Sequence, residues 1–146
     1  MSASVLVLTL AGRQVAIDTA AVNSVVELGA LTPVPRAPQF IIGLAALRSR
    51  TLTAIDSRAA LGLPPTARPL ARGQRAIITE IGGHSYAVLV EDVAGISSLL
   101  AEPAPVIGQA GPGWDRIALG VGETPLGAVL VIDLAALVAG PPAMAA

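Results

Sequence analysis

Leu10-Ala-Gly-Arg-Gln-Val-Ala-Ile17 recurs 71 positions later as Ile81-Gly-Gly-His-Ser-Tyr-Ala-Val88. In each copy, apolar residues flank a short turn that contains glycine, and Gly-Gly between two such runs is typical of a tight β-hairpin. A segment that recurs at a fixed spacing indicates an internal repeat. The pair of segments therefore predicts two related β-rich halves.

Other features recur in the same order along the chain. Val22 and Val25 match Val93 and Ile96 at the same offset of 71, the pair Pro33/Pro35 matches Pro103/Pro105 at 70, and Ile55-Asp56 matches Ile132-Asp133 at 77. The drift in offset indicates small insertions in loops. Chance similarity between two β-rich halves is the alternative interpretation, and the shared order of hairpin, proline pair and capped turn argues against it.

The composition favours an all-β domain with only short helices. The chain has 146 residues, of which 53% are hydrophobic, and its 15 glycines and 12 prolines separate short runs rich in Val, Ile and Leu. This pattern is typical of barrels and sandwiches. We expect one domain over residues 1–146, with halves at about 4–70 and 71–139 and a frayed tail at 140–146. The expected strands are Val5–Leu10, Gln14–Asp18, Ser24–Leu28, Phe40–Leu47, Thr51–Ile55, Ala76–Ile81, Ser85–Val90, Val93–Leu99, Trp114–Gly120 and Leu126–Ile132.

Two aspartates are expected to begin short helices. Asp56 and Asp133 each precede a segment rich in Ala and Leu, and Asp is a preferred N-cap residue. The same role explains both carboxylates without an active site.

Charge and residue usage argue against several classes of function. The net charge is −1, all nine cations are arginine and only three residues are aromatic, so no nucleic-acid partner is expected. The apolar stretch Leu126–Ala139 is too short to span a bilayer and contains Asp133, so direct membrane insertion is not expected either. No cation precedes the apolar run Val5–Leu10, so we expect no secretory signal and a cytoplasmic protein.

The residues that catalysis or metal binding requires are scarce. The chain has no cysteine and one histidine, His84, which is expected at an exposed hairpin tip. Glu91 and Asp92 are adjacent at the end of a strand, so their side chains point to different faces. We expect no catalytic residue, cofactor or metal. Arg48-Ser-Arg50 is the densest charged feature, and it is either a polar turn or a recognition site for carboxylates.

Residues 31–56 carry a family resemblance. Leu31-Thr-Pro-Val-Pro-Arg-Ala-Pro38, followed by Gly43, Leu47-Arg48 and Ala54-Ile-Asp56, resembles the motif of the CheW-like family. These proteins are coupling adaptors of bacterial chemotaxis arrays, and the resemblance covers about residues 4–139. It implies two pseudo-repeated, five-stranded, SH3-like β-barrel subdomains around a shared hydrophobic core, without catalysis or cofactor.

The resemblance also implies partners and a binding surface. A CheW-like adaptor bridges the helical hairpin at the cytoplasmic tip of a chemoreceptor and the regulatory domain of a histidine kinase. That kinase domain has the same fold, so assemblies form through contacts between barrels. By position in the motif, Arg48 lies near the receptor-binding face. The residues expected in the receptor groove are Val22, Ser24, Val25, Arg48, Val93 and Ile96.

Three positions depart from the family pattern. Ala46 replaces Asn, Ser49 replaces Gly, and Ser24 stands where many members carry a Glu that can pair with the arginine. A left-handed backbone at Ser49 would cost stability that Gly would not. The departures keep two alternatives open: a CheW-like adaptor in another pathway, such as pilus or surface-motility signalling, and, more remotely, a β-barrel protein that binds a small molecule.

Overall fold

The computed structural model describes residues 4–67, 70 and 72–140 and contains ten strands and four short helical segments in that part of the chain. The strands are β1 (Ser4–Leu10), β2 (Arg13–Asp18), β3 (Ser24–Glu27), β4 (Ile41–Leu47), β5 (Arg50–Ile55), β6 (Arg75–Ile81), β7 (His84–Leu89), β8 (Asp92–Ser98), β9 (Ala118–Thr124) and β10 (Gly127–Ile132). The helices are η1 (Thr19–Ala21), α1 (Ser57–Ala60), α2 (Trp114–Ile117) and α3 (Leu134–Val138). The expected all-β class with minor helices is confirmed.

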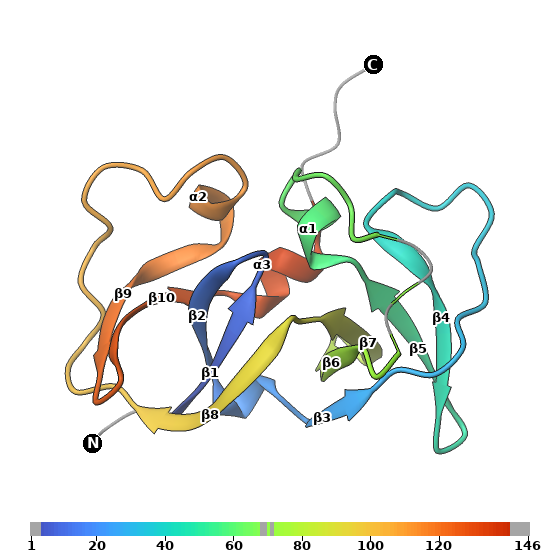
Figure 1. The fold of residues 1–146 in the computed structure, drawn as a ribbon, viewed down its shortest axis with the longest axis horizontal. Helices are drawn as coiled ribbons and strands as arrows, with labels where there is room; N and C mark the ends of the chain where they lie inside the picture. Colours follow the sequence, from blue (N-terminus) through green and yellow to red (C-terminus); the bar gives the residue numbers. More distant parts are fainter. Residues whose placement is uncertain (1–3, 68–69, 71, 141–146) are drawn as a thin grey trace.

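The strands form two five-stranded sheets that lie side by side along the long axis of the molecule (Figure 1). One has the order β8-β1-β2-β10-β9 and the other β3-β6-β7-β5-β4. After the edge strands β3 and β8, the chain crosses to the opposite edge of the same sheet. The backbone N–H of Leu100 donates to Glu123 in β9, and Thr32 exchanges hydrogen bonds with Leu44 in β4. These crossings close each sheet into a small barrel.

The barrels do not coincide with the expected halves 4–70 and 71–139. One barrel contains β3 to β7, whereas the other combines β1 and β2 with β8 to β10. Each repeat therefore contributes its first hairpin to one barrel and its last three strands to the other. The two halves are the two repeats, but neither half forms a barrel by itself, because strand pairing is set by packing between distant segments, which local sequence pattern does not report.

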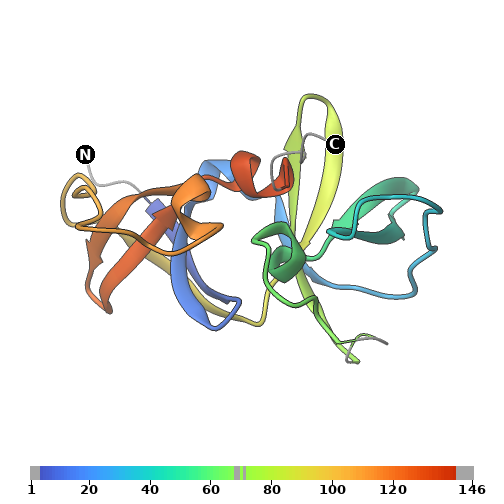
Figure 2. The same cartoon turned by 90° about the horizontal axis from the view of Figure 1, so that it is seen from above.

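Three apolar clusters fill the molecule. One cluster lies inside the β3–β7 barrel, a second lies inside the other barrel, and the largest lies between the two barrels. Figure 2 shows the two barrels as separate lobes, with α3 between them. Inner strands such as β1 and β6 are apolar on both faces because each faces a barrel interior on one side and the shared core on the other. In β6, Ile77 joins the shared core while Ala76 and Ile78 fill the barrel. The expected shared core is confirmed.

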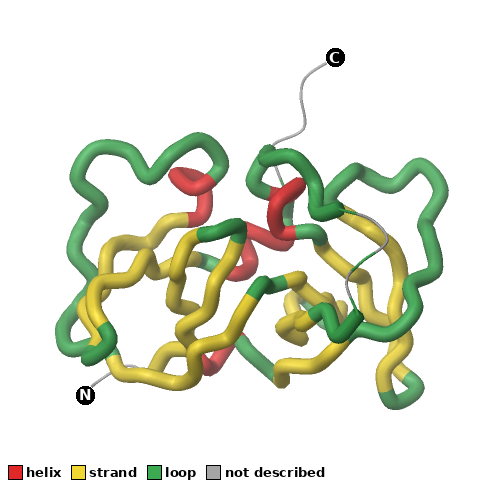
Figure 3. Tube along the Cα trace, in the orientation of Figure 1, coloured by secondary structure: helices red, strands yellow, loops and turns green. Residues whose placement is uncertain are grey.

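The helices begin where the caps predict, with one exception. The Asp56 side chain accepts from the N–H of Arg58 at the start of α1, and Asp133 accepts from those of Ala135 and Ala136 in α3. The expected strand Trp114–Gly120 is wrong in its first half, because Trp114–Ile117 forms α2 and β9 begins at Ala118. Figure 3 shows the long loops before β4 and before α2. Of the tail 140–146, residues 141–146 lie outside the described part of the chain.

Candidate interaction surface and inter-barrel contacts

Five of the six predicted groove residues lie on or beside the edge strands β3 and β8. We call these residues the β3–β8 surface: Val22, Ser24, Val25, Val93 and Ile96. Figure 1 shows β3 and β8 on the lower side of the molecule, with the three α-helices above them. The edge strands β3 and β8 occupy equivalent positions in the two sheets, as the repeat predicts, and the role of these residues in binding stays a prediction.

The β3–β8 surface is the border at which the shared core reaches solvent. Val25 lies opposite Ile77 in β6, and Ile96 lies opposite Leu6 in β1; both partners belong to the shared core. Residues directly opposite in a sheet share a face, so Val25 and Ile96 extend the core-facing sides outward. Val25 is 40% exposed and Ile96 is 73% exposed.

Val22 and Val93 form the floor of this surface. Both are half-buried, and both pack against the shared core. Exposed apolar residues above an apolar floor characterise surfaces that associate with other proteins. Ser24, the first residue of β3, is exposed beside them and adds a hydroxyl group without charge.

Arg48 lies apart from the other five predicted residues. It occupies the two-residue turn between β4 and β5, at the opposite edge of its sheet from β3. Within the described residues, no hydrogen bond or ion pair joins Arg48 to the β3–β8 surface. Arg48 and Ser49 both have left-handed backbone, with φ of +50° and +69°. Arg48 is exposed at this hairpin tip.

A polar cluster surrounds the tip of the β6–β7 hairpin next to this turn. His84 is exposed, as expected, but its Nε2 lies 2.8 Å from Thr53 Oγ1, and its ring lies 4.8 Å from that of Tyr86. Arg50 and Glu80 form an exposed ion pair at 3.6 Å. These contacts lie on the surface, where such pairs contribute little to stability.

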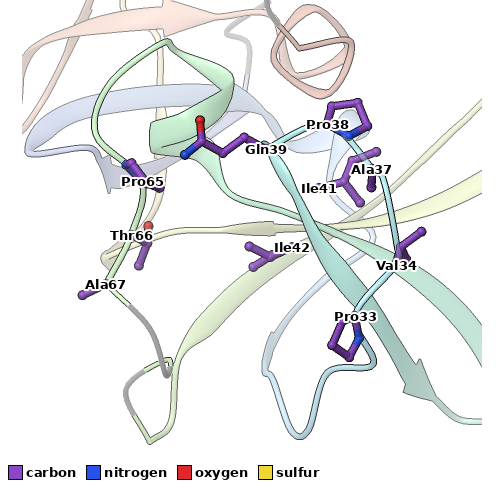
Figure 4. Close-up of a pocket in the computed structure, with 10 residues that line it drawn as sticks. All are labelled: Pro33, Val34, Ala37, Pro38, Gln39, Ile41, Ile42, Pro65, Thr66 and Ala67. Carbon is purple, nitrogen blue, oxygen red and sulfur yellow. The ribbon is translucent and has the colours of Figure 1, made fainter.

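An open pocket of about 570 Å³ lies between the loop before β4 and the segment after α1 (Figure 4). Its walls include Pro33, Val34 and Pro38 on one side and Pro65 and Ala67 on the other. Among the described residues that line it, none is charged, and Gln39 and Thr66 are the polar ones. The sequence predicted an extended Pro-rich segment here but not the pocket, because residues 33–38 and 65–67 meet only in the tertiary structure.

Glu91 and Arg116 link the two barrels, and the sequence alone did not predict either link. Glu91 Oε1 accepts from the N–H of Gly12 at 2.8 Å and lies 3.5 Å from Nη1 of Arg58, so it joins the β1–β2 turn to α1. Arg116 in α2 donates to carbonyl oxygens in α1 and α3. Burial lowers the pKa of the Arg116 guanidinium from its ordinary value, through desolvation of the charged form.

The described residues contain neither a group of metal ligands nor a membrane-spanning helix. No group of three or more His, Cys, Asp or Glu side chains among them could hold a metal ion. No helix among them is both long and apolar enough to cross a membrane.

Comparison with known proteins places the chain in a family. The model of the CheW-like domain matches residues 4–141, nearly the whole chain. The protein belongs to the CheW-like family. This is a family of non-catalytic scaffold and adaptor proteins. No curated protein matches the chain.

A solved structure supports the fold of this CheW-like protein. The crystal structure of the scaffolding protein TtCheW from Thermoanaerobacter tengcongensis superposes with a TM-score of 0.75 at 24% sequence identity. The match covers 92% of this chain and 86% of that chain. The two barrels packed side by side are therefore shared with a CheW protein.

Proposed function

We propose that this CheW-like protein is a cytoplasmic adaptor that couples the helical hairpin tip of a chemoreceptor to the regulatory domain of a histidine kinase. The observation that carries the proposal is the β3–β8 surface, where the shared core reaches solvent between two equivalent edge strands. A helix that lays apolar side chains against such a surface would bury Val25 and Ile96 and exclude water from Val22 and Val93. Neither nucleic acid nor direct insertion into a membrane is part of the proposal.

Arg48 has a separate role in this proposal. Apolar contacts supply affinity but little directionality, whereas a charged group at the margin of an interface fixes orientation. The exposed β4–β5 turn presents the Arg48 guanidinium to a carboxylate of the receptor. Ser24, where many family members carry a Glu, lies at the opposite edge of the sheet from Arg48.

Isothermal titration against a soluble receptor cytoplasmic fragment tests the receptor contact. Ile96→Asp places a charge in the middle of the surface and should weaken binding by at least about tenfold, the loss expected at an interface hot spot. Leu126→Asp is the matched control, because Leu126 is 66% exposed and lies on the β9–β10 turn rather than on β3 or β8. Equal binding by both variants contradicts the assigned surface.

Titration with the kinase regulatory domain tests the second contact. The wild-type protein should bind this domain, and Ile96→Asp should bind it as well as the wild type does. Absence of binding at high micromolar concentrations contradicts the coupling role. Binding of this protein to the kinase domain but to no chemoreceptor fragment would support a different pathway.

That different pathway is pilus or surface-motility signalling, with the protein again as an adaptor. The departures at Ser24, Ala46 and Ser49 from the family motif favour it, since they alter residues in and near the proposed receptor-binding face. The genes that neighbour this one distinguish the two pathways: a pilus operon supports the alternative, and chemotaxis receptor and kinase genes support the main proposal.

A further inference from the structure

Arg116 connects the two barrels on the side of the molecule opposite the β3–β8 surface. Its Nη2 donates to the carbonyl oxygen of Ala60, the last residue of α1, at 2.9 Å, and its Nη1 donates to that of Ala136 in α3. Helix α1 follows β5 of one barrel, and α3 follows β10 of the other. One guanidinium therefore holds an element from each barrel.

The two acceptors are carbonyls that short helices leave without partners. Helices of four and five residues cannot satisfy the carbonyls of their last turn internally, so these groups need donors from elsewhere. The planar guanidinium presents several N–H groups in fixed directions, and it can serve two acceptors at once. A cation is also favoured near the negative end of a helix.

The internal repeat shows that this connection exists once. The N–H of Asp56 donates to Phe40 O at 2.7 Å, and that of Asp133 donates to Ile117 O at 2.8 Å, so Phe40 and Ile117 are equivalent. The position before each is then Gln39 in the first repeat and Arg116 in the second. Gln39 is exposed and lines the open pocket instead of joining two helices.

We propose that Arg116 is a positioning residue that sets the angle between the two barrels and thereby the spacing of β3 and β8. The apolar contacts of the shared core are non-directional, whereas two hydrogen bonds from one planar group fix a direction. Because the helices lie above the barrels and the edge strands lie below them (Figure 1), a change of angle at the helices moves β3 relative to β8. The spacing itself follows from these contacts; its importance for receptor binding rests on the proposed function.

The absence of native cysteine gives a direct measurement of this spacing. Ser24→Cys and Ser98→Cys place spin labels on exposed positions of β3 and β8, and pulsed electron paramagnetic resonance then reports the distribution of distances between them. Arg116→Lys keeps a cation but has one nitrogen, which cannot serve both carbonyls in the same geometry. We expect a broader distribution with a shifted mean in this variant and in Arg116→Gln.

Arg13→Lys is the matched control. Arg13 also donates to a backbone carbonyl, that of Ala110 at 2.8 Å, but it does not bridge α1 and α3. This variant should leave the distances unchanged. Unchanged distances in folded Arg116→Lys overturn the proposal, and so does unfolding of both Arg116 variants, because Arg116 would then be required for folding rather than for an angle. The measurement needs no partner, so its outcome is separate from that of the receptor titration.

Discussion

Gly43 and Gly120, 77 positions apart, each lie directly against the backbone of the segment that crosses their barrel. A Cβ atom on Gly43 would lie 2.7 Å from Thr32 O, and a Cβ on Gly120 would lie 2.7 Å from Ala104 O. In both barrels, the chain that crosses from the edge strand passes directly over this glycine and exchanges hydrogen bonds with the residue after it. Closure of each barrel therefore requires a residue without a side chain.

Gly43→Ala should lower the free energy of unfolding by about 2 kcal/mol, since the clash is with backbone that cannot rotate away. Urea denaturation measures the loss. Gly29→Ala is the control, because nothing lies within 4 Å of a Cβ at Gly29. A similar effect of the two substitutions contradicts the packing argument.

Asp56→Ala should be more destabilising than Asp133→Ala, although both residues cap helices. Asp56 is fully buried and also accepts from the N–H and hydroxyl of Thr66, at 2.9 and 2.7 Å. Loss of several bonds to a buried carboxylate should cost about 3 kcal/mol, against about 1 kcal/mol for loss of a cap alone. Equal losses in urea denaturation would show that the Thr66 contacts contribute nothing.

Ser49→Gly should stabilise the protein by about 0.5 to 1 kcal/mol, because Gly adopts the left-handed backbone at this turn without the cost that a side chain imposes. Ser98→Gly, at an exposed position of β8, should be destabilising. Thermal unfolding of the two variants checks the sign of each effect. A decrease in Tm for Ser49→Gly is the outcome that contradicts the prediction.

Arg48→Glu should weaken receptor binding by about tenfold through reversal of the charge that orients the partner. Its Tm should change by no more than about 2 °C, since an exposed residue without described bonds contributes little to stability. Arg36→Glu is the control, because Arg36 is also an exposed arginine with left-handed backbone, at φ of +60°. If Arg48→Glu binds the receptor fragment as wild type does, the arginine has no orienting role.

Local pattern was sufficient to predict most strands and both capped helices. Short apolar runs end at turns that Gly or Pro defines, as at Gly82-Gly83, and Asp56 and Asp133 mark helix starts by chemistry that needs no tertiary context. Helix α2 was missed because Trp114–Ile117 is only four residues long, has no side-chain cap and leads directly into the strand β9, so its local pattern fits strand or helix equally well.

The repeat accounts for the position of most predicted site residues on or beside edge strands, and their role in binding stays a prediction. Val22 and Val25 match Val93 and Ile96 in sequence, and β3 and β8 occupy equivalent edges of the two sheets. Arg48 was grouped with them by motif, yet the hairpin that carries it lies at the far edge of its sheet. The links through Glu91 and Arg116 join residues from 20 to 79 positions apart, and no local pattern reports such contacts.

The exchange of hairpins between the repeats also sets the order in which the two barrels can be completed during synthesis. A ribosome releases all strands of the β3–β7 barrel by Leu89, but β1 and β2 must wait for β9 and β10, more than a hundred residues after the first strand begins. Domains form as units while the chain emerges. The barrel that contains the earliest strands is thus the last to be completed, and a gene cut between the repeats would yield two fragments that fold only in each other's presence.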